Sequence, residues 1–270
     1  MQNKTILITG STDGIGKQSA IELAQVGSRI IIHGRNAEKC ELTVKKIISL
    51  TGNLKIDHVV CDLSSLIEVK KMAESIKTQY EKLDVLINNA GLYENEKIFT
   101  LDGYETTFGV NYLAHFLLTM LILDRLKSSA PSRIINVSSI AHSNCDFDLE
   151  NLNSEKYFNN YNAYAISKAA NILFTYKLAE DLKETDVTVN SLHPGVITTK
   201  LLRKGFNMQG ASLEEGASTS VYLTSSPEVG GVTGKYFINS EESNSAPFTY
   251  DAELQGKLRD VSYKMVEKFL

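Results

Sequence analysis

Short apolar runs alternate with longer amphipathic segments along the whole sequence, and this alternation constrains the fold more than any other feature. The short runs predict strands, and their nearly continuous apolar character is typical of strands buried on both faces. The predicted strands are Lys4–Thr9, Arg29–His33, Lys55–Val60, Asp84–Asn88, Arg133–Ser138, Val187–Leu192 and Lys235–Asn239.

The segments between these runs have helical periodicity. Strand, helix and strand repeated in this way form right-handed crossovers, which give a parallel sheet covered by helices. We therefore predict a single α/β domain over residues 1–270, with a doubly wound parallel sheet of about seven strands and helices on both faces. The predicted helices are Ile15–Val26, Ala37–Leu50, Ser65–Tyr80, Tyr104–Lys127, Tyr161–Lys183 and a terminal segment over residues 254–270.

Composition excludes several classes of function. The formal net charge of −4 gives no general attraction to nucleic acid or to an anionic membrane surface. The three cysteines and five histidines are dispersed, so we expect neither a disulfide framework nor a metal site. The start of the sequence has no signal-peptide pattern, and no apolar stretch reaches the ~20 residues that span a bilayer. We expect a cytoplasmic protein without an integral membrane segment.

A glycine-rich turn, "TGSTDGIG", follows the first predicted strand and opens the first predicted helix. Gly10, Gly14 and Gly16 would let the backbone approach a pyrophosphate at the positive end of that helix, as in Rossmann-type folds. Their spacing is G-x-x-x-G-x-G rather than the common G-x-G-x-x-G. The alternative is a tight turn without a ligand.

A second feature is the stretch "YNAYAISKAA", which places Tyr164 four residues before Lys168. On a helix the two side chains would share one face, and a nearby ammonium lowers the pKa of a phenol from its usual value of about 10. A phenol tuned in this way can act as a general acid or base. The alternative is a surface contact between a lysine stem and a ring.

Five motifs in order together resemble the short-chain dehydrogenases/reductases: "TGSTDGIG", "CDLS", "NNAG", "NVSS" ahead of "YAISK", and "HPGVITT". The stretches "NYLAHFLL" and "SRIINVSSIAH" are most similar to the branch that contains retinol dehydrogenases and WW-domain oxidoreductases. Many members of that branch begin with a membrane anchor that this sequence does not show. We therefore expect no membrane-bound retinoid role.

The resemblance implies a catalytic set. Tyr164 would protonate a carbonyl oxygen during hydride transfer, and Lys168 would lower its pKa and bind the nicotinamide ribose. Ser139 would polarise the substrate oxygen, while Asn111 would hold a water that relays protons to Lys168. Asn111 could instead be a satisfied buried amide, and Tyr161 is a competing tyrosine without a lysine four residues later.

The resemblance also implies a cofactor set drawn from six places in the sequence. Asp62 would contact adenine, although it could equally cap the helix that begins near Ser65. Asn88 would help the chain pass close to the cofactor. The full set is Gly10, Ser11, Thr12, Asp13, Gly14, Ile15, Gly16, Arg35, Asp62, Leu63, Asn89, Ala90, Gly91, Tyr164, Lys168, Pro194, Gly195, Val196 and Thr199.

The second predicted strand indicates which cofactor is preferred. NAD-binding relatives of this fold usually carry an acid at its end, whereas this sequence has Gly34 followed by Arg35. A guanidinium suits a 2′-phosphate, so we predict that NADP(H) is preferred over NAD(H). Asp13 would repel that phosphate if it faced it, but it could simply cap the first helix.

Two irregular stretches, Ile140–Asn160 and His193–Ala211, are long enough to be functional loops. The second contains "LLRKGFNMQG", whose apolar side chains suit the underside of a mobile lid or an ordinary core; they are Leu201, Leu202, Phe206 and Met208. We predict a lipophilic aldehyde, ketone or alcohol as substrate. The acids of "CDFDLENLNSE" would repel anionic substrates if they reached the site.

Two other classes of function fit parts of the sequence. Ser139, His142 and Asp146 form a nominal hydrolase triad, but there is no G-x-S-x-G elbow. A non-catalytic dinucleotide-binding redox sensor on the same fold is the other alternative. The apolar character of Tyr104–Lys127 and Tyr161–Lys183 leads us to expect a homodimer or homotetramer.

Overall fold

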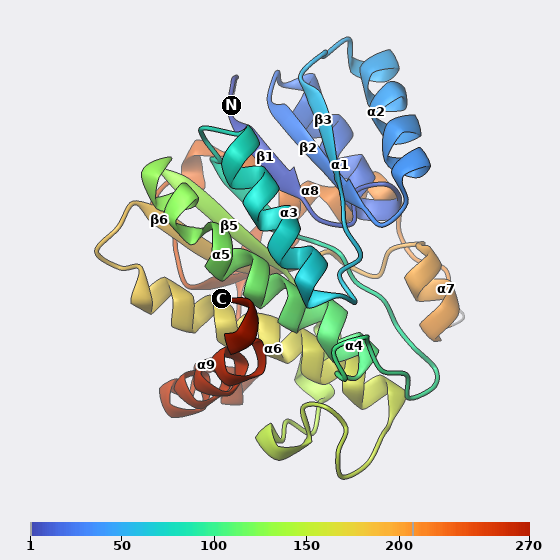
Figure 1. Cartoon of the computed structure of the whole chain (residues 1–270), viewed down its shortest axis with the longest axis vertical. Helices are drawn as coiled ribbons and strands as arrows, with labels where there is room; N and C mark the ends of the chain where they lie inside the picture. Colours follow the sequence, from blue (N-terminus) through green and yellow to red (C-terminus); the bar gives the residue numbers. More distant parts are fainter. Residues whose placement is uncertain (1, 207) are drawn as a thin grey trace.

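The computed structural model describes residues 2–206 and 208–270. Its centre is one eight-stranded sheet in the order β3-β2-β1-β4-β5-β6-β7-β8, parallel except for the antiparallel pair β7–β8 (Figure 1). The prediction of a doubly wound parallel sheet is confirmed. The short edge strand β8 was not predicted, because three residues with two glutamates carry no apolar pattern.

Each of the seven predicted strands is present, with boundaries within two residues of the prediction. The strands are β1 Thr5–Ile8, β2 Arg29–Gly34, β3 Ile56–Val60, β4 Val85–Asn88, β5 Ser132–Val137, β6 Val187–His193, β7 Lys235–Ile238 and β8 Glu241–Ser243.

The six predicted helices are present too, and α7 and α8 were missed. The predicted helix Tyr104–Lys127 is continuous but not uniform, because a π-helical segment at Gly109–Leu113 separates α4 from α5. The helices are α1 Gly14–Gln25, α2 Ala37–Thr51, α3 Leu66–Gln79, α4 Thr106–Phe108, α5 Ala114–Ser128, α6 Asn160–Asp181, α7 Lys200–Phe206, α8 Leu213–Ser225 and α9 Ala252–Val266.

The strands separate two apolar cores, one on each face of the sheet. In β1, Ile6 and Ile8 pack with side chains of α1, α2 and α8, whereas Leu7 packs with side chains of α3, α5 and α6. This alternation follows from the period of two in a strand. Both faces are buried, which explains the continuous apolar runs in the sequence.

The run Thr106–Ser128 is long and apolar enough to cross a membrane by length and composition alone, with a mean hydropathy of 1.5. The expectation that no stretch reaches this length is therefore wrong. Of its most apolar window, 83% is buried inside the molecule. Burial between the sheet and its neighbouring helices accounts for that composition, as in the core helices of other α/β folds.

The direction in which successive strands are added changes between β1 and β4. The first half of the chain adds β2 and β3 on one side of β1, and the second half adds β4 to β7 on its other side. In open parallel sheets, ligands bind in the crevice outside the carboxyl ends of the strands at such a point. The glycine turn follows β1 and the "NNAG" motif follows β4. The fold therefore brings these two predicted motifs to the same place.

Candidate active site

The glycine turn and the turn after β4 are packed so closely that neither tolerates an added side chain. Gly10 has φ +63°, and a Cβ on it would lie 2.8 Å from the Cα of Ala90. A Cβ on Gly16 would overlap the side-chain amide of Asn89. Asn89 in turn donates from Nδ2 to the Thr9 carbonyl at 2.8 Å. The two turns form one rigid surface of exposed backbone.

A buried histidine that the sequence analysis missed holds this turn in place. Gly10 donates its backbone N–H to Nδ1 of His33 at 3.0 Å, so the ring proton lies on Nε2, which donates to the Cys61 carbonyl at 3.1 Å. Burial lowers the pKa of His33 to about 4, which keeps the ring neutral. The Ser11 hydroxyl accepts from the His33 backbone N–H and donates to the Ile8 carbonyl.

Thr9 and His115 brace the turn from the other side. The backbone N–H groups of Asn89 and Ala90 both donate to the Thr9 hydroxyl at 2.9 Å. That hydroxyl lies 2.9 Å from Nε2 of His115, whose Nδ1 lies 3.0 Å from the Asn111 carbonyl oxygen. Burial lowers the pKa of His115 to about 3, so this ring is also neutral.

Asn111 lies in the π-helical segment and is fully buried. Its side chain accepts from the Leu92 backbone N–H at 2.8 Å and donates to the Leu92 carbonyl and to the Ser167 hydroxyl. These are the contacts of a satisfied buried amide, the alternative considered above. The role of Asn111 in holding a water stays a prediction.

Tyr164 and Lys168 both lie on α6 and are almost completely buried, with 6% and 3% of their surfaces exposed. Burial raises the pKa of Tyr164 to about 12, and a hydrogen bond with the Ser139 side chain opposes this increase. Burial lowers the pKa of Lys168 to about 8. The fold therefore brings the expected phenol close to the Ser139 hydroxyl, with the Lys168 ammonium buried nearby on the same helix.

The sequence placed the Lys168 ammonium and the Tyr164 phenol side by side on one helix face, but the ammonium does not contact the phenol oxygen. Its Nζ lies 5.7 Å from the centre of the Tyr164 ring and donates to the Val137 carbonyl at 3.0 Å. A Cβ on Gly91 would lie 3.4 Å from this Nζ and 3.6 Å from Oδ1 of Asn111. The lysine thus lies between α6, β5 and the turn after β4.

Neither competing assignment in this region finds support in the geometry. A hydrolase triad would need His142 between the Ser139 hydroxyl and Asp146. Instead, Nδ1 of His142 bonds the Ser139 carbonyl oxygen, and Asp146 accepts from the Tyr157 hydroxyl at 2.6 Å. Tyr161 lies half-buried on the same helix as Tyr164, with its ring edge toward Phe206.

The loop after β6 reaches back to the glycine turn. A Cβ on Gly14 would lie 3.8 Å from Cγ2 of Thr199, and Lys200 forms an ion pair with Asp13. Asp13 also accepts from the Gly14 backbone N–H, so it caps α1 as the alternative proposed. In the same loop Pro194 is half-buried, Val196 is 44% exposed and Gly195 has φ +93°.

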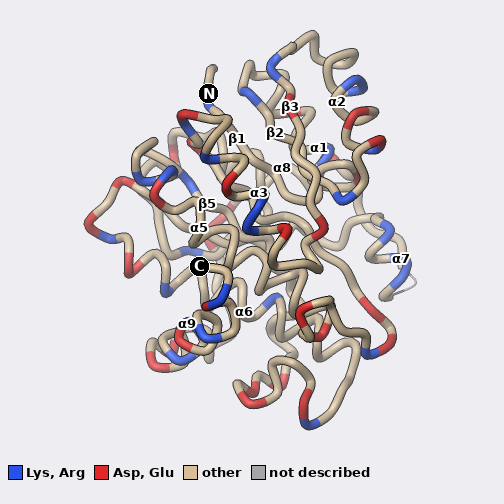
Figure 2. The backbone as a smooth tube through the Cα atoms, in the orientation of Figure 1, with Lys and Arg blue, Asp and Glu red and all other residues tan. Residues whose placement is uncertain are grey.

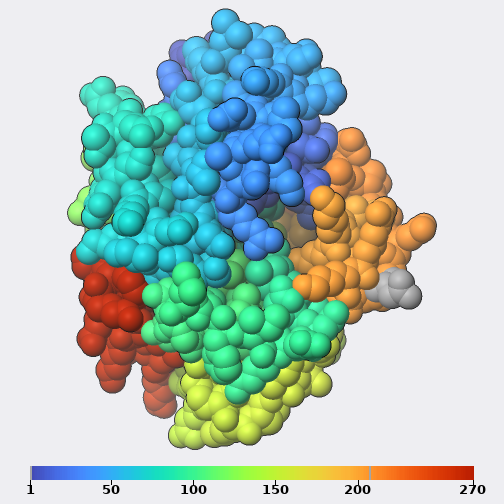
Figure 3. All heavy atoms as spheres, turned by 45° about the vertical axis from the view of Figure 1, so that its right-hand side comes forward, coloured from blue at the N-terminus to red at the C-terminus, as the bar shows by residue number. Residues whose placement is uncertain are grey.

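Helix α7 covers the tyrosine. The centre of the Phe206 ring lies 5.3 Å from that of Tyr93, in a tilted contact, and 6.1 Å from that of Tyr164, in an edge contact, and Leu201 joins the same cluster. A Cβ on Gly205 would lie only 2.9 Å from the Tyr93 ring. Figure 3 shows α7 beside a hollow that the N-terminal segment and the segment near residue 100 also border.

Two of the four apolar lid candidates lie elsewhere. Met208 is 52% exposed, and Leu202 is half-buried outside the aromatic cluster. At the base of the loop, Val196 and Thr198 exchange backbone hydrogen bonds with Ala211. Lys204 of α7 forms an ion pair with Glu94 in the segment before α4. Figure 2 shows that the acidic and basic residues are spread over many elements of the chain.

The remaining cofactor candidates border the glycine turn. Arg35 is exposed at the end of β2, and a Cβ on the preceding Gly34 would lie 2.6 Å from Cγ2 of Thr12. Asp62 accepts from the backbone and the hydroxyl of Ser64, so it does not cap α3. The first α3 amide bonds Asp102 instead. Leu63 is buried, and Ile15 is half-buried.

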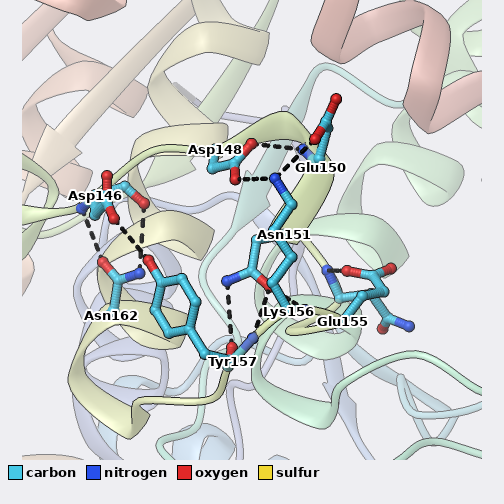
Figure 4. Close-up of polar contacts among 9 residues, drawn as sticks. Asp146, Asp148, Glu150, Asn151, Glu155, Lys156, Tyr157 and Asn162 are labelled. Atoms are coloured by element: carbon cyan, nitrogen blue, oxygen red, sulfur yellow. Dashed lines mark hydrogen bonds and ion pairs between the residues drawn. The ribbon is translucent and has the colours of Figure 1, made fainter.

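Several side chains of the acidic loop that precedes α6 are held by contacts within the loop and with the start of α6. Lys156 bridges Asp148 and Glu150 at 2.8 and 2.7 Å. Asp146 is held by Tyr157, as noted above, and its backbone bonds the Asn162 side chain (Figure 4). Lys156 is the one cation in this loop of four acids, so the loop keeps its negative charge while its side chains are held by contacts within it.

Comparison with known proteins decides the family. A family model described as short chain dehydrogenase matches residues 4–210. The chain belongs to the short-chain dehydrogenase family. Retinol dehydrogenase 14 from Homo sapiens is 40% identical over 98% of this chain and 87% of that protein. Retinol dehydrogenase 13 from Homo sapiens is 42% identical, over 97% of this chain and 84% of that protein.

Another curated relative and two solved structures agree with this assignment. Polyprenol dehydrogenase from Homo sapiens is 38% identical over 97% of this chain and 85% of that protein. An uncharacterized protein from Mycobacterium paratuberculosis has a TM-score of 0.83 at 28% identity, covering 98% of this chain and 94% of its own. The Pseudomonas aeruginosa RhlG/NADP active-site complex has a TM-score of 0.73 at 25% identity, with 88% and 94% covered.

The family and the fold together set the reaction class. This short-chain dehydrogenase is an NAD(P)-dependent oxidoreductase that interconverts an alcohol and a carbonyl group. The glycine turn fits a dinucleotide because Gly10 and Gly16 let it pack directly on the turn after β4, against Ala90 and Asn89, with no side chain between the two turns. The first N–H groups of a helix have no partner within the helix, so the start of α1 suits a pyrophosphate beside the Gly14 N–H that Asp13 caps.

Proposed function

We propose that this short-chain dehydrogenase is an NADP(H)-preferring enzyme that reduces a lipophilic aldehyde or ketone, or oxidises the corresponding alcohol, with Tyr164 as general acid and base. The observation that carries the proposal is the buried Tyr164 phenol. It meets the Ser139 hydroxyl on one side and the rings of Tyr93 and Phe206 on another. A proton donor is thus placed against an apolar wall.

In the reducing direction, Tyr164 gives its proton to the oxygen of the bound carbonyl. The Ser139 hydroxyl, which accepts from the Ala141 backbone N–H and opposes the rise in the Tyr164 pKa, would donate to the same oxygen and hold it in line. In the oxidising direction, Tyr164 takes the proton from the alcohol. Because burial raises the pKa of Tyr164 to about 12, the phenol is protonated at neutral pH and is ready for reduction.

Lys168 supplies positive charge near the phenolate that remains after the proton has left. Its Nζ is 5.7 Å from the ring centre, and its present partner is a single neutral carbonyl, that of Val137. A small rotation of the flexible stem would bring the ammonium closer to the phenol oxygen or to a ribose hydroxyl. Lysine carries this charge only when it is protonated, so we expect the effect on Tyr164 to require protonated Lys168.

The cofactor would lie along the backbone surface made by the two turns. Residues 10–16 would hold the pyrophosphate, Asn89–Gly91 and Lys168 the ribose next to the nicotinamide, and Thr199 the carboxamide. When bound in reduced form, a nicotinamide dinucleotide supplies the hydride. The protein orients the two reactants and excludes water from them. Helix α7 would exclude the water, because it covers Tyr164.

Three observations support the preference for NADP(H). Arg35 is exposed at the end of β2 without a hydrogen-bond or ion-pair partner among the described residues, so it is free to bind a 2′-phosphate. No acid stands at that strand end. Asp13, the one nearby acid that argued against the preference, is paired with Lys200 and bonded to the Gly14 amide.

The aromatic cluster supports a lipophilic substrate. Tyr93, Phe206 and Leu201 surround the Tyr164 ring with apolar surface, and Tyr161 faces Phe206. Relatives named retinol dehydrogenase and polyprenol dehydrogenase are consistent with this class. A hydrophobic wall of this kind gains binding energy from each buried methylene, about 0.8 kcal/mol.

The test is a panel of carbonyl compounds measured with NADPH and with NADH. The panel contains medium- and long-chain aldehydes, flat conjugated aldehydes and small anionic keto acids. We expect turnover with the lipophilic members, a higher kcat/KM with NADPH, and loss of turnover in Tyr164→Phe. Binding of NADPH without turnover of any compound would indicate a sensor, and faster turnover of the anionic keto acids would refute the substrate class.

A further inference from the structure

His142 lies directly behind Ser139, and no step of the proposed reaction uses it. It belongs to the single-turn 3-10 helix Ile140–Asn144 that follows β5, and its side chain is 1% exposed. Both ring nitrogens have hydrogen-bond partners in the main chain. An imidazole held at both ends is fixed in orientation and in tautomer.

The partners determine which nitrogen carries the proton. The backbone N–H of Ala246 is 3.0 Å from Nε2, and a backbone N–H can only donate, so Nε2 accepts. The proton of the neutral ring must then be on Nδ1, which donates to the Ser139 carbonyl oxygen at 2.7 Å. Burial lowers the pKa of His142, in agreement with a neutral ring.

The far end of this bridge is anchored to the helix that carries Tyr164. Ser245, next to Ala246, bonds the hydroxyl of Tyr176 at 2.7 Å, and Tyr176 is on α6. The Ser245 backbone N–H also donates to the Tyr250 hydroxyl, whose ring stacks on that of Tyr176. A continuous set of contacts therefore connects the Ser139 carbonyl with α6 through His142.

The residue before Ser139 is tied to the same helix. The Ser138 hydroxyl donates to the Lys168 carbonyl oxygen at 2.7 Å. Ser139 is thus clamped on both sides, by Ser138 directly and by His142 through the segment around Ala246. With both sides fixed, the main chain of Ser139 cannot shift relative to Tyr164 without breaking a buried hydrogen bond.

We propose that His142 is a positioning residue that aligns the Ser139 hydroxyl with the Tyr164 phenol through its Nδ1–H bond to the Ser139 carbonyl oxygen. The inference rests on the proposed catalytic role of Ser139 and Tyr164. Hydrogen-bonded reacting groups need this alignment, since a displacement of about 1 Å can cost about 100-fold in rate.

Two amide substitutions distinguish the contribution of the Nδ1 hydrogen bond from that of the Nε2 hydrogen bond. In His142→Asn, the side-chain NH2 takes the place of Nδ1 and can still donate to the Ser139 carbonyl, but it does not reach Ala246. In His142→Gln, the amide takes the place of Nε2 and loses the bond to Ser139. We expect kcat to fall about 10- to 100-fold in His142→Gln and no more than about threefold in His142→Asn. The NADPH Kd should stay unchanged in both.

A second variant covers the possibility that His142→Gln does not fold. Ala246 has φ −58°, which suits proline, so Ala246→Pro keeps this backbone angle while a ring carbon replaces the N–H that fixes the tautomer and faces Nε2 of His142. It should lower kcat without changing the NADPH Kd. The matched control is His58→Gln, because His58 is a half-buried histidine on the edge strand β3. This substitution should change neither kcat nor the NADPH Kd.

The decisive readout is a double-mutant cycle with Ser139→Ala, measured as single-turnover rates below the melting temperature of every variant. If His142 acts through Ser139, replacing it by Gln in the Ser139→Ala protein causes no further loss. Three results would overturn this inference while leaving the proposed function in place. They are an equal loss of rate from His142→Gln in the wild-type and Ser139→Ala proteins, equal losses of kcat in His142→Asn and His142→Gln, and a changed NADPH Kd in either variant. A wild-type protein that turns over no carbonyl would overturn the proposed function as well.

Discussion

The two sides of the active site are held together by different forces. The cofactor side, which consists of the glycine turn at residues 10–16 and of Asn89–Gly91, is held by buried hydrogen bonds and by glycines that admit no side chain. The substrate side, which consists of α7 and Tyr93, is held by ring contacts and by exposed ion pairs such as Lys204–Glu94. Tyr164 lies where the two sides meet.

This difference teaches which side can move. Buried, fully paired hydrogen bonds are strong because the surroundings are poorly polarisable, so opening the cofactor side would leave several polar groups unpaired. An exposed ion pair contributes about 0–1 kcal/mol to the stability of the folded structure, and an aromatic pair contributes about 0.5–1.5 kcal/mol. The cofactor side is therefore a fixed surface, whereas α7 can open and close over a substrate.

The largest effect is expected at the meeting point of the two sides. Tyr164→Phe removes only the transferable proton, so kcat should fall about 10²- to 10⁴-fold, the usual contribution of general acid catalysis. The NADPH Kd should change little because the cofactor side is untouched. Steady-state kinetics and cofactor titration measure the two quantities, and Tyr161→Phe is the control. A silent Tyr164→Phe with a damaged Tyr161→Phe would reverse the assignment.

Lys168 links the two sides at a cost in stability. Its pKa falls from 10.5 to about 8 in the folded protein, so between these values the unfolded chain binds more protons and wild-type stability should rise with pH. Lys168→Met removes the buried charge but keeps the stem. Its free energy of unfolding should exceed that of wild type by about 3 kcal/mol at pH 7.

This advantage should shrink as the pH approaches 10.5. Urea titrations at pH 7, 9 and 10.5 measure the difference, while turnover should be strongly reduced at every pH. A Lys168→Met protein that is less stable than wild type by the same amount at all three pH values would show that the ammonium is well paired in the fold.

Arg35 tests the cofactor side alone. Arg35→Leu should weaken NADPH binding by about 1.5–3 kcal/mol, which is about tenfold to more than 100-fold, with NADH binding nearly unchanged. Lys45→Leu on α2 is the matched control for loss of one exposed charge. Equal weakening of both cofactors, or tighter NADH binding by wild type, would mean that Arg35 does not recognise the 2′-phosphate.

The smallest effect is expected on the substrate side. Phe206→Ala removes three ring contacts, with Tyr93, Tyr161 and Tyr164, of about 0.5–1.5 kcal/mol each at most, so KM for a lipophilic aldehyde should rise a few-fold to about tenfold. Gly205→Ala should act in the same direction, because the new Cβ would displace α7 from Tyr93. Met208→Ala, at an exposed position, is the control. A weakened NADPH Kd in Phe206→Ala would show that the two sides are not separate.

The sequence predicted the strands, the glycine turn and the first helix of the cofactor side well because each of them is encoded locally, while the contacts of its residues with a cofactor stay a prediction. A strand followed by glycines and a helix has few alternative structures, and the period of two in β1 and β2 sets which residues face each core. The bracing of the turn by His33 was not visible, since its partners Gly10 and Cys61 lie 23 and 28 residues away. A buried histidine within a strand was the one available signal.

The substrate side was harder to predict because its contacts join distant segments of little regular pattern. The apolar residues of "LLRKGFNMQG" indicated a lid, yet only Leu201 and Phe206 reach the aromatic cluster. The partner ring, Tyr93, follows the "NNAG" motif and was not identified as a site residue. Helix α7 is one short element of seven residues, and its position depends on Tyr93 rather than on its own sequence.

The central claim is a fixed cofactor side beside a movable substrate side, and amide hydrogen exchange tests it most directly. In the protein without ligands, the backbone amides of Gly10, Ser11, Asn89 and Ala90 should exchange at least about 100-fold more slowly than those of Leu202–Phe206. Both sides exchanging at the same rate, or α7 exchanging more slowly than the glycine turn, would contradict the account.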